Sequence, residues 1–186
     1  ASLSDGDRER AVRAFSWLQH YGVNHIDTSV SYSDADACIG ELIENRRNDY
    51  FLAGKIDART YSEASKELDK SLGDLRTDHF DLLQMHELVR WDDVERFLGG
   101  DGAAGVLRRA KERGLARSIG ATAHGFDAPV LLKRCVESLP LDSVLLPYNY
   151  LLSTDEEYRQ AFGELRELCR RRGIGVLTIK SVLRSP

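Results

Sequence analysis

The chain alternates short apolar runs with helical patterns along its whole length, and this alternation restricts the folds that it can adopt. Six apolar runs have the length of β-strands, and they span residues 23–27, 51–55, 80–86, 116–121, 143–146 and 175–179. Helices are predicted at residues 7–21, 34–46, 62–75 and 104–113, from Asp127 onward, at residues 155–172, and over a short stretch after Trp91. Strands separated by helices form parallel sheets, so the carboxyl ends of all six strands should lie at one edge.

The spacing of these strand–helix units indicates the kind of α/β fold. A (β/α)8 TIM barrel of about 250 residues uses about 31 residues for each unit. Here 186 residues over six units also give 31 (186/6 = 31). We therefore expect one TIM-barrel domain over residues 1–186 that contains about six of the eight βα units. The first strand and the C-terminal strand with its helices are expected to be absent. Both outer strands would then present unpaired edges in a fold whose sheet is normally closed, so we expect this sequence to be a segment of a longer barrel chain.

Composition restricts the partners of the protein. The 26 basic and 30 acidic residues give a net charge of -4, whereas a general nucleic-acid binder needs a basic patch. No apolar run approaches the roughly 20 residues that span a bilayer, and the N-terminus lacks the features of a signal peptide. We expect a cytoplasmic protein with neither a nucleic-acid nor a membrane partner, and the sequence leaves its oligomeric state open.

The three cysteines, Cys38, Cys135 and Cys169, are far apart in the sequence. They form no C-x-x-C pair, which gives no support to a zinc or iron–sulfur site. We expect no metal, and we expect each thiol to be a small buried hydrophobe in a reducing compartment.

Three successive predicted strands end in residues with chemically useful side chains: Asp27, Lys55 and His86. Tyr32 follows in the loop after the first of these strands and should lie over the same edge. A tyrosine has an ordinary pKa of about 10, and a nearby cation lowers it. Lys55 could be that cation and Asp27 could orient it, while His86 steers a substrate carbonyl. Such a set would donate a proton to a carbonyl oxygen as hydride reaches the carbon.

These residues resemble the signature of the aldo-keto reductase family. The resemblance is carried by residues 22–28 with Tyr32, by Lys55, by Ser71 and Leu72 with Asp78, and by residues 81–86 and 117–120. It covers nearly the whole chain and implies a (β/α)8 barrel that binds a nicotinamide cofactor over the rim without a Rossmann domain. It also implies a catalytic tetrad of Asp27, Tyr32, Lys55 and His86, with Tyr32 as the general acid and base. Residues 122–125 and 147–150 resemble a bacterial branch of the family.

The resemblance also implies a cofactor site, at which this sequence departs from the family pattern. Thr122 and His124 stand where many members use a Ser-Asn pair to bind the nicotinamide carboxamide. Leu145 stands where a glutamine is usual, and Ile179 where an aromatic side chain often stacks on the ring. The remaining candidates are Asn149 beside the cofactor, Lys180 and Arg184 at the pyrophosphate, and Ser181. NADP(H) is favoured over NAD(H), although the adenosine-ribose contacts would lie in the absent unit.

The function that we expect is NAD(P)H-dependent reduction of a small-molecule aldehyde or ketone to an alcohol. Two alternatives remain open. One is a nicotinamide-binding sensor or subunit with little turnover, since Leu145 and Ile179 would place the ring loosely. The other is a lyase of the same fold that forms a Schiff base on Lys55. In the loop of residues 87–102, Trp91 and Phe97 either line an apolar substrate pocket or pack onto the barrel.

Overall fold

The computed structural model of the protein describes residues 5–182. Within this range the strands are β1 (His25–Asp27), β2 (Phe51–Ile56), β3 (Phe80–Leu88), β4 (Ala116–Ala123), β5 (Ser143–Pro147) and β6 (Gly175–Ile179). The α-helices are α1 (Asp5–His20), α2 (Ala35–Ile43), α3 (Tyr61–Asp74), α4 (Trp91–Leu98), α5 (Ala104–Glu112), α6 (Ala128–Ser138), α7 (Tyr150–Thr154) and α8 (Glu156–Arg172). A 3-10 helix, η1 (Glu44–Asp49), joins α2 to β2.

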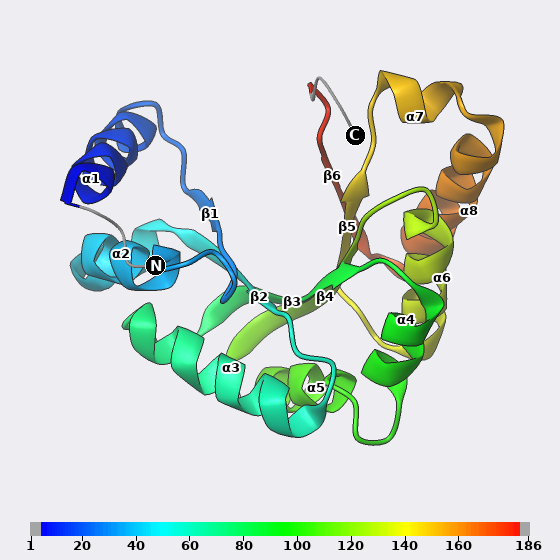
Figure 1. The fold of residues 1–186 in the computed structure, drawn as a ribbon, viewed down its shortest axis with the longest axis horizontal. Helices are drawn as coiled ribbons and strands as arrows, with labels where there is room; N and C mark the ends of the chain where they lie inside the picture. Colours follow the sequence, from blue (N-terminus) through cyan, green and yellow to red (C-terminus); the bar gives the residue numbers. More distant parts are fainter. Residues whose placement is uncertain (1–4, 183–186) are drawn as a thin grey trace.

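The six strands form one parallel sheet in chain order, from β1 to β6. The sheet curves, with helices along its outer face and with β1 and β6 at the two ends of the curve (Figure 1). Within residues 5–182, no pairing joins β1 to β6, so the sheet is a half-barrel. The predicted α/β class and the partial TIM barrel are confirmed.

The register of the sheet divides its side chains between two faces. Lys55 pairs with Gln84 and Gln84 with Gly120, so these three residues face the same side. Their neighbours Ile56 and Met85 alternate to the other face, where they join the hydrophobic core beneath the helices. Lys55 and Gln84 therefore lie on the inner face, and His86 and Thr122 lie on the same face two residues further along their strands.

Local capping explains where several helices begin and end. Thr60 caps α3, because its hydroxyl accepts from the backbone N–H of Glu63 and donates to the Glu63 carboxylate. Asp155 accepts from the backbone N–H of Tyr158 at 2.8 Å and caps α8. The same helix ends at Gly173, whose φ of 69° is a left-handed conformation that glycine adopts without strain.

Several elements differ from the sequence prediction by a few residues at their ends, as α2 does, which gives way to η1 after Ile43. Two differences have a clear physical cause. β1 begins at His25 rather than Val23, because only three of its residues pair with β2 at this end of the sheet. The short helix α7 was not predicted. It forms because the Asn149 side chain accepts from the backbone N–H of Leu152 at 2.9 Å and caps it.

The core lies between the sheet and its outer helices. Phe97 of α4 is fully buried in it, so this aromatic packs onto the barrel, whereas Trp91 remains half exposed. All three cysteines are buried and unbonded to one another, in agreement with the predicted small hydrophobes. Among the described residues, no helix combines the length and the apolar character needed to cross a bilayer.

Candidate active site

Lys55 and Asp27 meet at the carboxyl ends of β2 and β1. The Lys55 Nζ lies 2.6 Å from Asp27 Oδ1 and donates a second bond, of 3.2 Å, to the backbone carbonyl of Thr28. The Lys55 side chain is only 3% exposed, whereas that of Asp27 is 42% exposed. The ammonium group is therefore held inside the mouth of the half-barrel, and its counter-ion lies at the rim.

A buried carboxylate fixes the backbone that receives this lysine. Asp36, in the first turn of α2, accepts from the hydroxyl of Thr28 at 2.6 Å and from that of Ser71 at 2.5 Å. All three side chains are buried. Because Ser71 belongs to α3, Asp36 connects the loop after β1 to the helix that covers β2. It thereby helps to fix the Thr28 carbonyl, and with it Lys55.

Tyr32 and His86 lie beside this ion pair. The Tyr32 hydroxyl is 3.5 Å from His86 Nε2, and the two rings are nearly perpendicular, with centroids 5.7 Å apart. Lys55 Nζ lies 5.3 Å from the centre of the Tyr32 ring. The structure thus brings together the four side chains that the sequence placed at three successive strand ends.

The predicted direction of the Tyr32 pKa shift was wrong. The sequence suggested that Lys55 and Asp27 would lower the pKa of Tyr32. In the structure the pKa of Tyr32 is raised above its ordinary value, first by burial and then by the negative charges of Asp27, Asp57 and Glu87. The pKa remains raised although Lys55 Nζ lies 5.3 Å from the centre of the Tyr32 ring, and the same ammonium group is also paired with Asp27.

Sequence reasoning also missed two residues that contact His86. Asp57 Oδ1 lies 2.5 Å from His86 Nδ1, and the Ser29 hydroxyl lies 3.3 Å from the same nitrogen. Asp57 stands just beyond the end of β2, two residues after Lys55. The rule that strand ends gather at one edge could have included it. Nothing in the spacing, however, indicated that its carboxylate would turn towards His86.

The cofactor candidates at the end of β4 lie at the same edge. Thr122 is buried, and its hydroxyl accepts from the backbone N–H of Glu87 at 2.8 Å. His124 is half-buried, and its Nδ1 is buried without a hydrogen-bond partner among the described residues. Burial and the positive charge of Lys180 lower the pKa of His124, so its imidazole is neutral at pH 7. A neutral ring with a free nitrogen is suited to bind a polar group.

The other candidates lie around the end of β6. The Asn149 side chain caps α7, and its Nδ2 donates to the Lys180 carbonyl at 3.4 Å. Lys180 and Ile179 are partly exposed and Ser181 is exposed. Leu145 is buried, and Arg184 lies outside the described residues.

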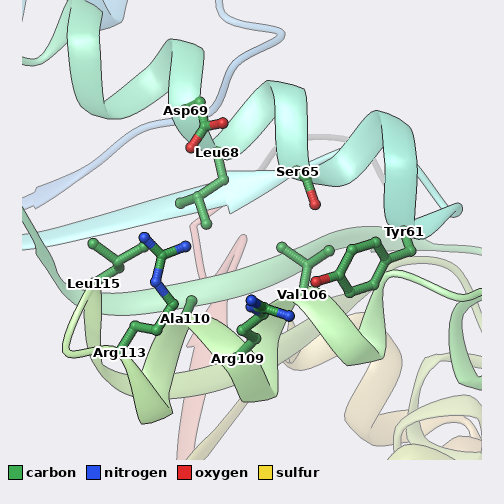
Figure 2. Close-up of a pocket in the computed structure, with 9 residues that line it drawn as sticks. All are labelled: Tyr61, Ser65, Leu68, Asp69, Val106, Arg109, Ala110, Arg113 and Leu115. Carbon is green, nitrogen blue, oxygen red and sulfur yellow. The ribbon is translucent and has the colours of Figure 1, made fainter.

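A small cavity elsewhere in the molecule is separate from this site. It has a volume of about 70 Å³ and lies between α3 and α5, on the helical side of the sheet (Figure 2). Tyr61, Ser65, Arg109 and Arg113 are among the residues that line it. None of the strand-end residues described above contributes to it. Within residues 5–182, no group of three or more His, Cys, Asp or Glu side chains is placed to hold a metal ion.

Comparison with known proteins agrees with this fold. The model of the aldo/keto reductase family matches residues 2–185. "Uncharacterized oxidoreductase YqkF" of Bacillus subtilis is 25% identical over 166 residues, which are 82% of this chain and 51% of that protein. This chain therefore spans about half the length of the curated relative that it matches.

Solved structures of similar proteins share the fold. The holo form of the aldo-keto reductase AKR11C1 of Bacillus halodurans has a TM-score of 0.75 and 21% identity, over 92% of this chain and 57% of that one. An aldo/keto reductase of Klebsiella pneumoniae, in complex with NADP and acetate, has a TM-score of 0.69 and 20% identity, over 93% and 58%.

Proposed function

The chain belongs to the aldo/keto reductase family, and on this premise we propose that it is the catalytic part of an NAD(P)H-dependent oxidoreductase. Its proposed reaction is the reduction of a small-molecule aldehyde or ketone to an alcohol. One observation carries the proposal. The Tyr32 hydroxyl lies beside His86 Nε2, while the buried, ion-paired Lys55 lies 5.3 Å from the tyrosine ring.

Tyr32 is the proposed proton donor. Its raised pKa keeps the hydroxyl protonated at neutral pH, as a general acid must be. A nicotinamide dinucleotide, when bound, supplies the hydride. The carbonyl oxygen then develops alkoxide character and becomes a stronger base than a phenolate, so the proton passes from the Tyr32 oxygen to the substrate oxygen.

The cations of the site stabilise the charge that this transfer leaves on Tyr32. Lys55 is kept in place by Asp27 and by the Thr28 carbonyl, so it need not reorganise during the reaction. His86 Nε2 lies 3.5 Å from the same hydroxyl and can donate to it when that nitrogen carries a proton. In this proposal Asp27 acts through Lys55, and the carbonyl is oriented by His86.

The residues at the carboxyl ends of β4 and β6 fit a nicotinamide dinucleotide. His124 presents a neutral ring with an unpartnered buried nitrogen, which can bind an amide. We propose that it acts with Thr122, while Lys180 and Ser181 receive the phosphates and Ile179 and Asn149 border the ring. NADP(H) is preferred to NAD(H) in this proposal. Its support is the similar Klebsiella pneumoniae aldo/keto reductase, which was solved in complex with NADP and acetate.

The setting of the reaction is part of the same proposal. We propose a cytoplasmic enzyme whose partners are small molecules. The half-barrel would be part of a single barrel domain, in which further strands pair with β1 and β6. The difference in length from the matched proteins supports this, since the chain covers 57% and 58% of the two structures.

The two alternative functions make different demands on the site. A Schiff-base lyase needs a free amine on Lys55, but Nζ is bonded to Asp27 and to the Thr28 carbonyl. A nicotinamide-binding sensor needs only the cofactor side of the site. Tight NADPH binding without reduction across a broad carbonyl panel would favour the sensor.

The test compares Tyr32→Phe with Tyr21→Phe in the full polypeptide that contains this sequence. Tyr21 is 71% exposed and stacks on Trp17, so its variant is a matched control. NADPH oxidation is followed with a panel of aldehydes and ketones, and NADPH affinity by fluorescence. We expect Tyr32→Phe to lower kcat by at least about 100-fold, since general acids contribute about 10²–10⁴-fold. NADPH affinity and the control should be unchanged. Undiminished reduction by Tyr32→Phe would refute the mechanism.

A further inference from the structure

Asp57 follows the end of β2, and hydrogen bonds to α3 hold the backbone around it in place. Its backbone N–H donates to the Glu67 carboxylate of α3 at 2.9 Å, and the backbone N–H of Ala58 donates to the same oxygen at 2.9 Å. The chain is therefore fixed on either side of the Asp57 side chain. From this anchored backbone, Oδ1 reaches His86 Nδ1 at 2.5 Å and Oδ2 accepts from the Ser29 hydroxyl at 3.2 Å.

This contact is between a charged carboxylate and an enclosed imidazole. Burial alone would raise the pKa of Asp57, but hydrogen bonds from His86, Ser31 and Ser29 and the charge of His86 lower it below its ordinary value. Asp57 is thus ionised at neutral pH. The His86 side chain is only 8% exposed, so its ring has little freedom to turn towards water.

The protonation of His86 follows from its partners. An ionised carboxylate only accepts hydrogen bonds, so the contact with Asp57 requires a proton on Nδ1. The other nitrogen, Nε2, is then the one that faces the Tyr32 hydroxyl. If Nε2 also takes a proton, Asp57 stabilises the imidazolium, as the carboxylate does in a Ser-His-Asp triad.

We propose that Asp57 is a positioning residue for His86, which it holds with a proton on Nδ1 and with Nε2 directed at the reacting oxygens. The inference rests on the proposed function and deepens it. In the neutral ring, Nε2 accepts from Tyr32. In the imidazolium, which has taken its second proton from solvent before the transfer, Nε2 donates to the Tyr32 oxygen while that oxygen passes its own proton to the substrate.

Several other charged groups surround Asp57 and His86 and affect how the site responds to pH. Lys55 of β2, Glu87 of β3 and His124 after β4 face the same edge, and Asp27 lies beyond Lys55. Asp57 differs from all of them because it alone, among the described carboxylates, has a hydrogen bond to the His86 ring. Its removal should therefore act on His86 in a way that the loss of another charge does not.

The decisive variant is Asp57→Asn in the full polypeptide. The Asn amide has nearly the same shape as the carboxylate, but its NH₂ group can donate to His86 Nδ1, which permits the tautomer with the proton on Nε2. The neutral amide also no longer stabilises the imidazolium. The side-chain nitrogen signals of His86 in ¹⁵N NMR, recorded without substrate, report the tautomer directly. We expect the Nδ1–H form in the wild type and a gain of the Nε2–H form in Asp57→Asn.

Kinetics provide the second readout. We expect kcat for carbonyl reduction to fall by about 10–100-fold in Asp57→Asn. Loss of the hydrogen-bond partner that orients a functional imidazole has an effect of this size. The KM of the carbonyl should be little changed. The pH above which activity declines should also move downward, because the negative charge of Asp57 is one of the causes that raise the pKa of Tyr32.

Glu87→Gln is the matched control, since it removes a carboxylate at the same edge that has no hydrogen bond to His86. It should leave the His86 tautomer unchanged. Asp57→Glu keeps the negative charge and should retain the Nδ1–H form. A loss of activity that both Asp57 variants share would come from unfolding rather than from the lost charge. An unchanged tautomer together with an unchanged kcat in Asp57→Asn would overturn the inference. If instead the tautomer depends on Asp57 but the wild type reduces no carbonyl, the positioning role stands and the proposed function fails.

Discussion

Gly40 offers a test of how the loop that carries Tyr32 is held against the barrel. It lies in α2, one turn after Asp36, where the helix meets the C-terminal end of α3. A Cβ at this position would lie 2.8 Å from the carbonyl carbon of Leu75 and 2.9 Å from its Cα, and closer still to the carbonyl oxygen of Asp74. Each of these atoms belongs to the backbone, so no side-chain rotation can relieve the contact.

The cost of Gly40→Ala can be estimated from these distances. Ordinary contact begins at 3.4 Å, so the Leu75 atoms alone require the helices to separate by 0.5–0.6 Å (3.4 − 2.9 and 3.4 − 2.8), and the Asp74 carbonyl oxygen requires more. Overpacking of this kind costs about 1–3 kcal/mol, whereas Ala gains about 1 kcal/mol over Gly in a helix. Because the neighbours are backbone, we expect the upper part of that range and a net loss of about 1–2 kcal/mol.

Urea unfolding followed by circular dichroism measures this change, with Gly163→Ala in α8 as the control. A Cβ at Gly163 meets nothing within 4 Å, so only the gain in helix propensity, about 1 kcal/mol, should remain. The two Gly→Ala variants should therefore change the free energy of unfolding in opposite directions. A Gly40→Ala protein as stable as Gly163→Ala would refute the reasoning, because it would mean that α2 and α3 are not in contact there.

Two further predictions follow from the electrostatics of buried groups. Burial alone would raise the pKa of Asp81, but the backbone N–H of Leu52 and the guanidinium groups of Arg47 and Arg117 hold it below its ordinary value. Asp81 therefore stabilises the fold above the unfolded pKa of about 3.9, and this contribution is lost as the pH falls through the lower folded value. Asp81→Asn should cost about 3 kcal/mol at pH 7 in urea unfolding, and a difference that did not narrow at pH 3 would contradict this account. Burial raises the pKa of Cys135 to about 12, so this thiol should resist a thiol reagent at pH 8 until the protein unfolds, and rapid labelling of the native protein at Cys135 would show that it is not enclosed.

The sequence predicted the framework of the site because that framework depends on local periodicity. The runs that end at Lys55 and His86 are recognisable from their apolar residues alone, and the helices between them require a parallel sheet. Once the sheet is parallel, the strand ends must share an edge, so the gathering of the tetrad residues could be inferred without coordinates. The short helix α7 was not predicted because it depends on a single cap at Asn149 rather than on a repeating pattern.

The contacts made inside that edge could not be inferred in the same way. Asp57 and His86 are separated by 29 residues, and their contact depends on the turn after β2 and on the anchor of that turn to Glu67. The direction of the Tyr32 pKa shift depends on burial and on which carboxylates surround the ring.

The sequence by itself thus determined the class of fold, the order of the strands and the edge at which the chemistry is placed, because periodicity and connectivity act over a few residues. Only the tertiary structure decided which charges face one another across that edge. Interactions between charges change steeply with distance and burial, and both are set by the curvature and packing of the whole sheet.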